Sequence, residues 1–179
     1  MIMSKNEKTV VLYQSKTGYT KKYAVALAER LNCTLLEGSK VSVKDLSGYD
    51  TIFVGGGIYA GGINGAKLLT GNYEQLKNKQ LILFAVGSSP VKEEVIDQLR
   101  KQNIPAEQQS RIKLYYLRGG FDYSKLSGFY KFMMSLMKKQ LHKLEATTPE
   151  ADQIFNDFSR PKDFTDLKAL DGMLSNLNA

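Results

Sequence analysis

The feature that most constrains the fold is a regular alternation of short apolar runs with amphipathic helical patterns. The first, third and fourth runs are almost continuously apolar, which is typical of parallel strands covered on both faces. Helical patterns lie between the runs, at Tyr19–Leu31 and Val91–Asn103, with a weaker, broken one at Gly65–Lys79. This order predicts an α/β fold, a doubly wound parallel sheet of five strands with helices on both faces. The five predicted strands are Thr9–Gln14, Thr34–Gly38, Asp50–Gly56, Gln80–Gly87 and Arg111–Leu117.

The length and composition favour one ordinary globular domain. The chain has 179 residues, of which 42% are hydrophobic and 24% charged, and this suits a single core spanning residues 1–179. No apolar run is long enough for a transmembrane helix and the N-terminus lacks a signal peptide, so we expect a cytoplasmic protein. The lone Cys33 excludes an intrachain disulfide and a cysteine-rich metal site, and core filling is favoured over a reactive thiol.

The net charge of +7 is compatible with several kinds of partner. Nucleic acid, anionic lipid and acidic substrates would all be attracted, and a solvated lysine-rich surface would give the same charge. The sequence has no aromatic-rich basic sheet motif and no paired Cys/His ligands. We therefore expect no binding of nucleic acid and no metal site.

Three loops that follow predicted strands are rich in Gly, Ser or Thr, namely Ser15–Thr20, Gly55–Gly65 and Gly87–Pro90. Ligands of open parallel sheets bind outside the carboxyl ends of the strands, so these loops are where function is expected. In the first loop, three hydroxyls and a glycine precede the start of a helix, whose free N–H groups favour an anion. Helix capping alone would need only one hydroxyl. The spacing fits neither a P-loop nor the three-glycine dinucleotide fingerprint.

The stretch Val11–Ala24, "VLYQSKTGYTKKYA", resembles the flavodoxin signature at every constrained position. The resemblance implies a flavodoxin-like sheet with strand order 2-1-3-4-5, and it implies that the first loop binds the phosphate of FMN. Hydroxyls and backbone amides would make most of the contacts, with lysines supplying general attraction. The loop residues assigned to this site are Ser15, Lys16, Thr17, Gly18, Tyr19 and Thr20.

The flat ring of FMN needs a slot, which the other two loops are expected to supply. In the second loop, glycines let the backbone approach a planar ligand, and Tyr59 is the candidate stacking residue unless it is an ordinary exposed tyrosine. The third loop, "GSSP", would reach the pyrimidine edge of the ring, and Ser89 and Pro90 would also begin the next helix as N-cap and first helical residue. That loop lacks the second stacking aromatic of many flavodoxins, which suits a bound substrate. The residues assigned to the slot are Gly57, Ile58, Tyr59, Ala60, Gly61, Gly87, Ser88 and Ser89.

No residue of these loops is an obvious acid, base or nucleophile, so we assign no catalytic residue and expect the flavin to carry the redox chemistry. The only histidine, His142, is interpreted as a solvated helix residue.

A basic, methionine-rich helix is predicted over residues 124–144. Its apolar arc of roughly 200° is wider than core packing commonly needs. It would pack on the sheet and a neighbouring helix, lie on a membrane surface, or dock an apolar, acidic partner.

The whole chain resembles the flavodoxin-like, quinone-dependent protoporphyrinogen dehydrogenases. The resemblance rests on length, basicity, Gly55–Ile58 and the helix "GFYKFMMSLMKKQ", while Tyr59-Ala60 replaces that group's Arg-Tyr and its basic insertion is not evident. It implies an FMN-dependent oxidoreductase, of dehydrogenase or quinone reductase type, acting on a quinone or a small apolar substrate such as protoporphyrinogen. The implied partners are a quinone, a porphyrinogen or a redox protein, with peripheral contact to the inner face of the membrane. Two alternatives stay open, a flavodoxin-type electron carrier without its own substrate and a flavin-free interaction module.

Overall fold

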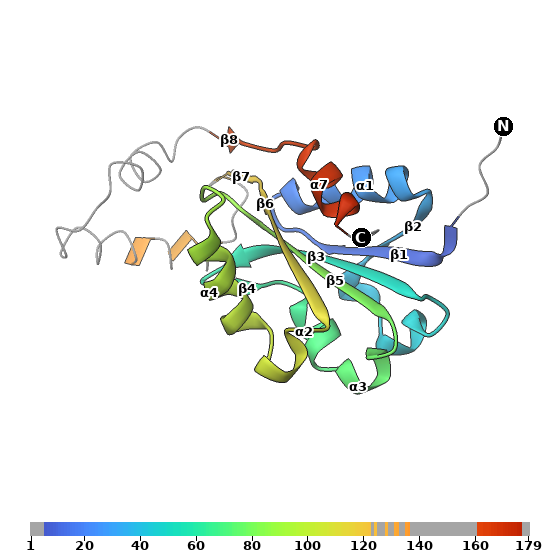
Figure 1. The fold of residues 1–179 in the computed structure, drawn as a ribbon. Helices are drawn as coiled ribbons and strands as arrows, with labels where there is room; N and C mark the ends of the chain where they lie inside the picture. Colours follow the sequence, from blue (N-terminus) through green and yellow to red (C-terminus); the bar gives the residue numbers. More distant parts are fainter. Residues whose placement is uncertain are drawn as a thin grey trace.

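The computed structural model describes residues 6–122 and 161–176, together with Ser124, Gly128, Lys131, Phe132, Ser135 and Leu136. Its centre is a parallel sheet in the order β2-β1-β3-β5-β6 (Figure 1). Counted among these five long strands, the order is the predicted 2-1-3-4-5, so the predicted fold class is confirmed. The strands are β1 Asn6–Gln14, β2 Cys33–Glu37, β3 Thr51–Tyr59, β5 Gln80–Gly87 and β6 Ile112–Arg118.

Helices cover both faces of the sheet, as Figure 1 shows. One face carries α1 (Tyr19–Leu31) and α7 (Ala169–Ser175). The other carries α2 (Ala66–Thr70), α3 (Tyr73–Leu76) and α4 (Glu93–Asn103). The weak helix predicted over residues 65–79 is indeed broken, into α2 and α3. Single 3-10 turns complete the connections, at Gly38–Lys40, Val43–Leu46 and Ala106–Gln108.

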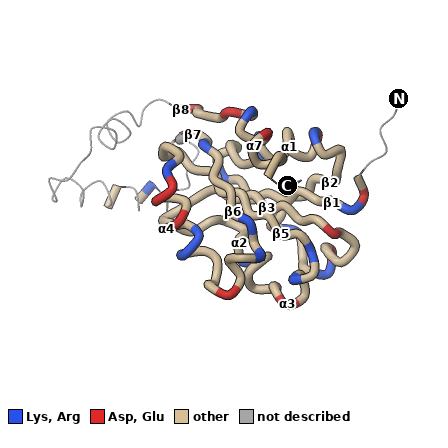
Figure 2. Tube along the Cα trace, viewed as in Figure 1, with Lys and Arg blue, Asp and Glu red and all other residues tan. Residues whose placement is uncertain are grey.

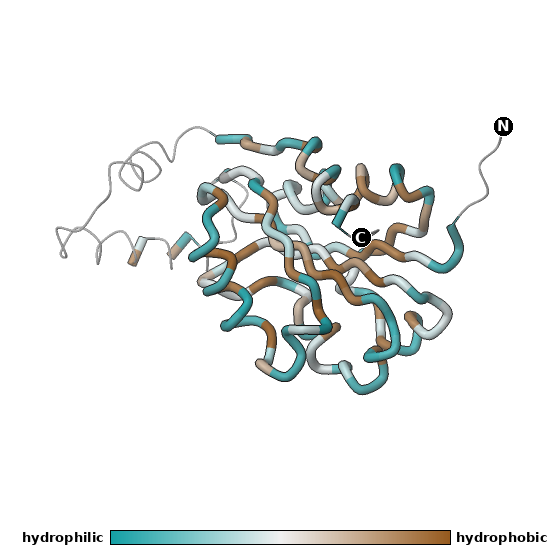
Figure 3. The backbone as a smooth tube through the Cα atoms, in the orientation of Figure 1, coloured by the Kyte–Doolittle hydropathy of each residue, from teal (hydrophilic) through white to brown (hydrophobic). Residues whose placement is uncertain are grey.

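The central strands are buried on both faces because side chains of a strand alternate between its two sides. In β5, Leu81, Leu83 and Ala85 pack toward α2, α3 and α4. Their neighbours Ile82, Phe84 and Val86 pack toward α1 and α7. Figure 3 shows the resulting apolar centre of the sheet. Cys33 is half-buried against the α1 and α7 side of the core, in agreement with its expected core-filling role.

Two predicted boundaries at the carboxyl edge of the sheet are wrong. Strand β3 continues three residues past Gly56 to Tyr59 and turns into the short antiparallel strand β4, Gly62–Ile63. Gly57, Ile58 and Tyr59 are therefore strand residues, because pairing with β4 extends the strand into the expected loop. Helix α4 begins at Glu93 with Lys92 at its N-cap, so Ser89 is not the cap and Pro90 is not the first helical residue. Ser88, Ser89 and Pro90 belong instead to a loop, in which the Ser88 and Ser89 carbonyls accept hydrogen bonds from side chains of β6.

Residues 161–176 return to the α1 side of the sheet. Strand β8 (Lys162–Asp163) pairs antiparallel with β7 (Gly120–Phe121). Side chains of α1 then hold the segment: Lys22 pairs with Asp163, Tyr23 Oη accepts the Asp166 N–H at 2.9 Å, and Arg30 donates to the Leu167 carbonyl at 2.8 Å. Helix α7 then buries Leu170 and Met173.

The basic helix predicted over residues 124–144 lies outside the described residues, apart from the six named above, and so does His142. Of its apolar side chains, Phe132 and Leu136 are described, and they are 60% and 44% exposed. Among the helices that the structure describes, none has the length and hydropathy to span a bilayer.

Candidate functional site

The register of the sheet brings the three glycine- and serine-rich segments to one edge. Gln14, the last residue of β1, pairs with Gly56 of β3. On the other side of β3, Gly57 pairs with Val86 of β5. The loop after Gln14 and the loop after Gly87 therefore flank the end of the central strand β3, as expected for the carboxyl edge of a doubly wound sheet.

The first loop is a closed turn that ends at a helix N-terminus. Gly18 has φ 96°, the left-handed region that favours glycine, and its N–H donates to Ser15 Oγ at 3.0 Å. Helix α1 begins at the next residue, with no side-chain cap. The first amides of α1 therefore remain available to an anion, together with the positive end of the helix dipole. Thr17 lies half-buried within this turn and Lys16 is exposed beside it.

Two residues at the start of α1 point in different directions. The ring of Tyr19 lies in the core, where its Cε1 atom is 2.3 Å from the position that a Cβ on Gly120 would take. A contribution of Tyr19 to the site would therefore come from its backbone. Thr20 is a buried residue, and its Oγ1 atom lies 3.6 Å from the position that a Cβ on Gly57 would take.

The second loop covers the place where Thr20 approaches Gly57. The ring of Tyr59 lies against Gly57, with Cε2 3.0 Å from an ideal Cβ on that glycine. Lys16 Nζ lies 4.9 Å from the centroid of the same ring. The chain then reverses through Ala60 and Gly61, both with positive φ (49° and 79°), as a two-residue turn of a tight β-hairpin requires. Lys16, Thr20, Gly57 and Tyr59 thus form one contact cluster between the first and second loops.

The β3–β4 hairpin is held from helix α4 by a single side chain. Asn103 Nδ2 donates to the Gly61 carbonyl at 2.8 Å, and Asn103 Oδ1 accepts the Ile63 N–H at 2.7 Å. The backbone of the hairpin also closes on itself, because the Asn64 N–H donates to the Gly57 carbonyl at 3.1 Å.

The third loop is fixed through its carbonyls. The Gly87, Ser88 and Ser89 carbonyls accept hydrogen bonds from the Gly119 N–H at 2.7 Å, Arg118 Nε at 3.2 Å and Tyr116 Oη at 2.8 Å. Burial raises the pKa of Tyr116 to about 12, so its hydroxyl stays a donor at neutral pH. Because three successive carbonyls are turned toward β6, the loop has a defined orientation before any ligand binds.

A cavity of about 360 Å³ separates the second loop from the third. Five of the predicted residues line it: Ile58, Gly61, Gly87, Ser88 and Ser89. Sequence reasoning missed Gln98, Gln102 and Tyr116, which line the cavity together with Val95 and Leu99. Gln98 and Gln102 could have been noticed, since two amides four residues apart share one face of α4. Tyr59 and Ala60 instead line a larger groove of about 1010 Å³ between α2 and α4.

Several solved structures align with part of this chain. The Trp repressor binding protein from Bacillus subtilis aligns at 15% identity and TM-score 0.47, over 63% of this chain and 83% of that one. A flavodoxin, WrbA-like protein from Agrobacterium tumefaciens aligns at 23% identity and TM-score 0.40, over 60% and 76%. A flavoprotein in complex with FMN from Lactobacillus acidophilus aligns at 16% identity and TM-score 0.39, over 63% and 92%. No curated protein matches the chain.

A protein-family model also matches the chain. The model described as "Flavodoxin domain" matches residues 10–148, which include the phosphate-loop motif and the second and third loops. The match covers well over half of the 179 residues. It confirms the family expected from Val11–Ala24 and, with the family, FMN as the expected cofactor. The chain therefore belongs to the flavodoxin domain family.

Proposed function

We propose that this protein is an FMN-dependent oxidoreductase that passes electrons between the flavin and a quinone or a small apolar substrate. The observation that carries the proposal is the convergence of three loops at the ends of β1, β3 and β5. A helix N-terminus and the buried Thr20 hydroxyl lie on one side of Gly57, and a cavity of about 360 Å³ begins at Ile58 on the other. One ligand with an anionic end and a planar end would suit both the helix N-terminus and the cavity.

The first loop would bind the phosphate of FMN. Ser15 keeps the turn closed through Gly18, and the hydroxyls of Thr17 and Thr20 and the first amides of α1 are the donors. Lys16 adds attraction from the surface. Gly57, Ile58, Tyr59, Ala60 and Gly61 would hold one side of the ring, and Gly87, Ser88 and Ser89 its pyrimidine edge. When bound, FMN supplies the redox chemistry, and these residues orient it and limit the access of water.

Gln98 and Gln102 offer neutral amides at the cavity, which suit carbonyl oxygens such as those of a quinone. Protoporphyrinogen is the second candidate substrate, from the resemblance of the chain to the quinone-dependent dehydrogenases. A redox protein is the third kind of partner.

The segment 124–144 is proposed to make peripheral contact with the inner face of the membrane. Its exposed Phe132 and Leu136 are four residues apart and therefore on one side of a helix, and five lysines accompany them between Lys125 and Lys143. Binding to vesicles with anionic lipid that weakens with salt would support this contact, and binding indifferent to both would contradict it.

Titration with FMN tests the proposal, with quenching of flavin fluorescence as the readout. Riboflavin, which lacks the phosphate, should bind much more weakly. Thr20→Val keeps the shape of the buried side chain and removes its hydroxyl, so it should weaken FMN binding and leave riboflavin binding unchanged. Absence of FMN binding at micromolar concentration would refute the proposal. Turnover of a quinone or of protoporphyrinogen would then distinguish an enzyme from an electron carrier that exchanges electrons only with a redox protein.

A further inference from the structure

Arg118, the last residue of β6, is a half-buried cation at the third loop. Its Nε donates to the Ser88 carbonyl at 3.2 Å, and Ser88 lines the cavity between the second and third loops. On the other side, the Cζ atom of Arg118 lies 3.9 Å from the centroid of the Phe164 ring. The guanidinium is therefore held between the loop and an aromatic face, in a fixed plane.

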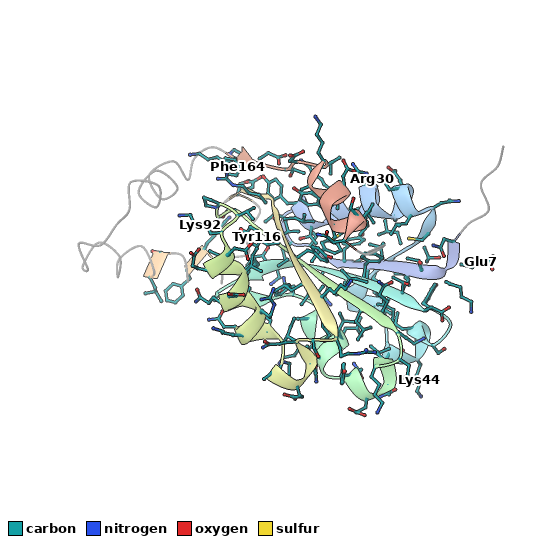
Figure 4. All side chains as sticks on the ribbon, viewed as in Figure 1. Glu7, Arg30, Lys44, Lys92, Tyr116 and Phe164 are labelled. Atoms are coloured by element: carbon teal, nitrogen blue, oxygen red, sulfur yellow. The ribbon has the colours of Figure 1, made fainter. Side chains whose placement is uncertain are left out.

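Residues 161–176 build this arrangement together with α1. The Arg118 carbonyl accepts a hydrogen bond from Tyr23 Oη at 2.7 Å, and the same hydroxyl accepts the Asp166 N–H at 2.9 Å. The Phe164 N–H donates to the Gly119 carbonyl at 3.2 Å, which places Phe164 beside β6. Figure 4 shows Phe164 and Tyr116 at the end of the molecule where β6 terminates. The third loop and Phe164 thus fix the side chain of Arg118, while α1 fixes its backbone, and this limits the freedom of the guanidinium, as is expected of a group with a defined task.

The charge of Arg118 lacks a partner of opposite sign within the described part of the chain. The ion pairs found there involve Lys22, Arg30, Lys40, Lys77 and Arg100, all on other elements. Figure 2 shows such mixed charges along α4 and on the segment before α7. A half-buried guanidinium stays protonated and is costly without a negative group nearby. That cost is offset when a ligand brings the negative charge.

The field of Arg118 reaches the cavity. Tyr116 lines that cavity, and the positive charge of Arg118 opposes the effect of burial on the pKa of the Tyr116 hydroxyl. A negative charge that develops within the cavity would be stabilised by the same field.

We propose that Arg118 stabilises the fully reduced, anionic form of bound FMN and thereby raises the reduction potential of the cofactor. The inference rests on the proposed function, in which Ser88 and Ser89 contact the pyrimidine edge. Reduction adds two electrons and one proton to the oxidised flavin, and the negative charge that remains resides in the pyrimidine part of the ring. At an effective dielectric constant of about 20, a unit charge roughly 10 Å away changes such an equilibrium about tenfold.

The test compares the two-electron potential of FMN bound to the wild type, Arg118→Met and Arg118→Lys, with dithionite as reductant and an equilibrating dye as reference. Arg118→Met should favour the oxidised cofactor about tenfold, which corresponds to a fall of about 30 mV for a two-electron couple. Arg118→Lys keeps the charge and should recover most of that change. Arg100→Met is the matched control, because it removes an arginine charge on α4 whose partner is Asp97.

The potential separates an electrostatic role from a structural one. A site that is merely looser weakens the binding of oxidised and reduced FMN alike and leaves the potential of the bound cofactor unchanged. Phe164→Leu removes the stacking face and keeps the charge, so its potential should stay near that of the wild type. If Arg118→Met binds FMN with the wild-type potential, or shifts it no more than Arg100→Met does, the inference is wrong. If Arg118→Met does not bind FMN, Arg118→Gln replaces it, and loss of binding there too would overturn the inference in favour of a structural role. If the wild type itself does not bind FMN, the proposed function fails and the inference fails with it.

Discussion

Gly56 is the position where an added methyl group should most directly disturb the proposed ring slot. A Cβ on Gly56 would lie 1.9 Å from the Asn64 carbonyl oxygen, 2.8 Å from its carbon and 2.9 Å from Ile63 Cγ2. The nearest of these atoms is backbone and belongs to the connection that follows β4. Increasing that distance to 3.0 Å, the shortest that real Cβ contacts show, moves the hairpin connection by about 1.1 Å. Overpacking of this kind costs about 1–3 kcal/mol.

The substitution Gly56→Ala should therefore lower both stability and affinity for FMN. We expect a lower urea midpoint with an unchanged slope, and FMN binding weakened by about tenfold or more because displaced ring contacts are lost. Gly57→Ala is the matched control: its Cβ would meet side chains alone, the Tyr59 ring at 3.0 Å and Thr20 Oγ1 at an ordinary contact distance of 3.6 Å, and the Tyr59 ring can rotate away. Its stability should stay within about 1 kcal/mol of the wild type. Wild-type stability and affinity in Gly56→Ala would refute the argument that this backbone contact positions the slot.

Three further predictions concern the groups around the site. Asn103→Ala should lower the free energy of unfolding by about 1–3 kcal/mol and weaken FMN binding, because the Gly61 carbonyl and the Ile63 N–H lose their partner. Asn103→Asp keeps only the acceptor, so its stability in urea denaturation should lie between those of the wild type and Asn103→Ala. The pKa of Tyr116 is raised to about 12 by burial, so its contribution to stability is complete below about pH 10 and is lost as the pH rises toward 12; a Tyr116→Phe variant should lack that alkaline component in denaturation curves. Burial opposes ionisation of Asp163, but hydrogen bonds from Lys22 and the Thr165 N–H lower its pKa to about 2, so its contribution is complete above about pH 4 and is lost as the pH falls toward 2. Since both side chains of that pair are about half-exposed, the stability difference between wild type and Asp163→Asn should be about 1 kcal/mol or less at neutral pH and vanish near pH 2.

Local pattern was sufficient to predict the sheet and the turn of the first loop. Continuous apolar runs identify β1, β3 and β5 because central parallel strands are buried on both faces. The first loop was also predictable, since its hydroxyls, Gly18 and the start of α1 are neighbours in sequence. The two wrong boundaries have a common cause. Pairing of Tyr59 with Gly62 extends β3, and bonds from β6 to the Ser88 and Ser89 carbonyls replace the expected helix start. The first pairing depends on the geometry of a tight turn, and the bonds from β6 come from residues far away in the chain, so neither is evident from the local sequence.

The rest of the site depends on contacts that no local pattern contains. Arg118 reaches Ser88 from 30 residues away, and Asn103 reaches Gly61 from 42 residues away. Tyr59, the candidate stacking residue, lies against Gly57 and beside Lys16 of the first loop, and no local pattern indicates these two contacts. The direction of a side chain at the end of a strand follows from the pleat, and the unpredicted extension of β3 put Tyr59 within that pleat.

The bond between Asn103 and Ile63 also makes the hairpin observable by hydrogen exchange. A two-residue strand such as β4 would ordinarily open easily, and its amides would exchange quickly with solvent. The Ile63 amide instead donates at 2.7 Å to a side chain of α4 and is buried. Its exchange rate therefore reports how tightly the hairpin is attached to α4. One amide proton can then reveal whether a ligand beneath the hairpin tightens that attachment or releases it.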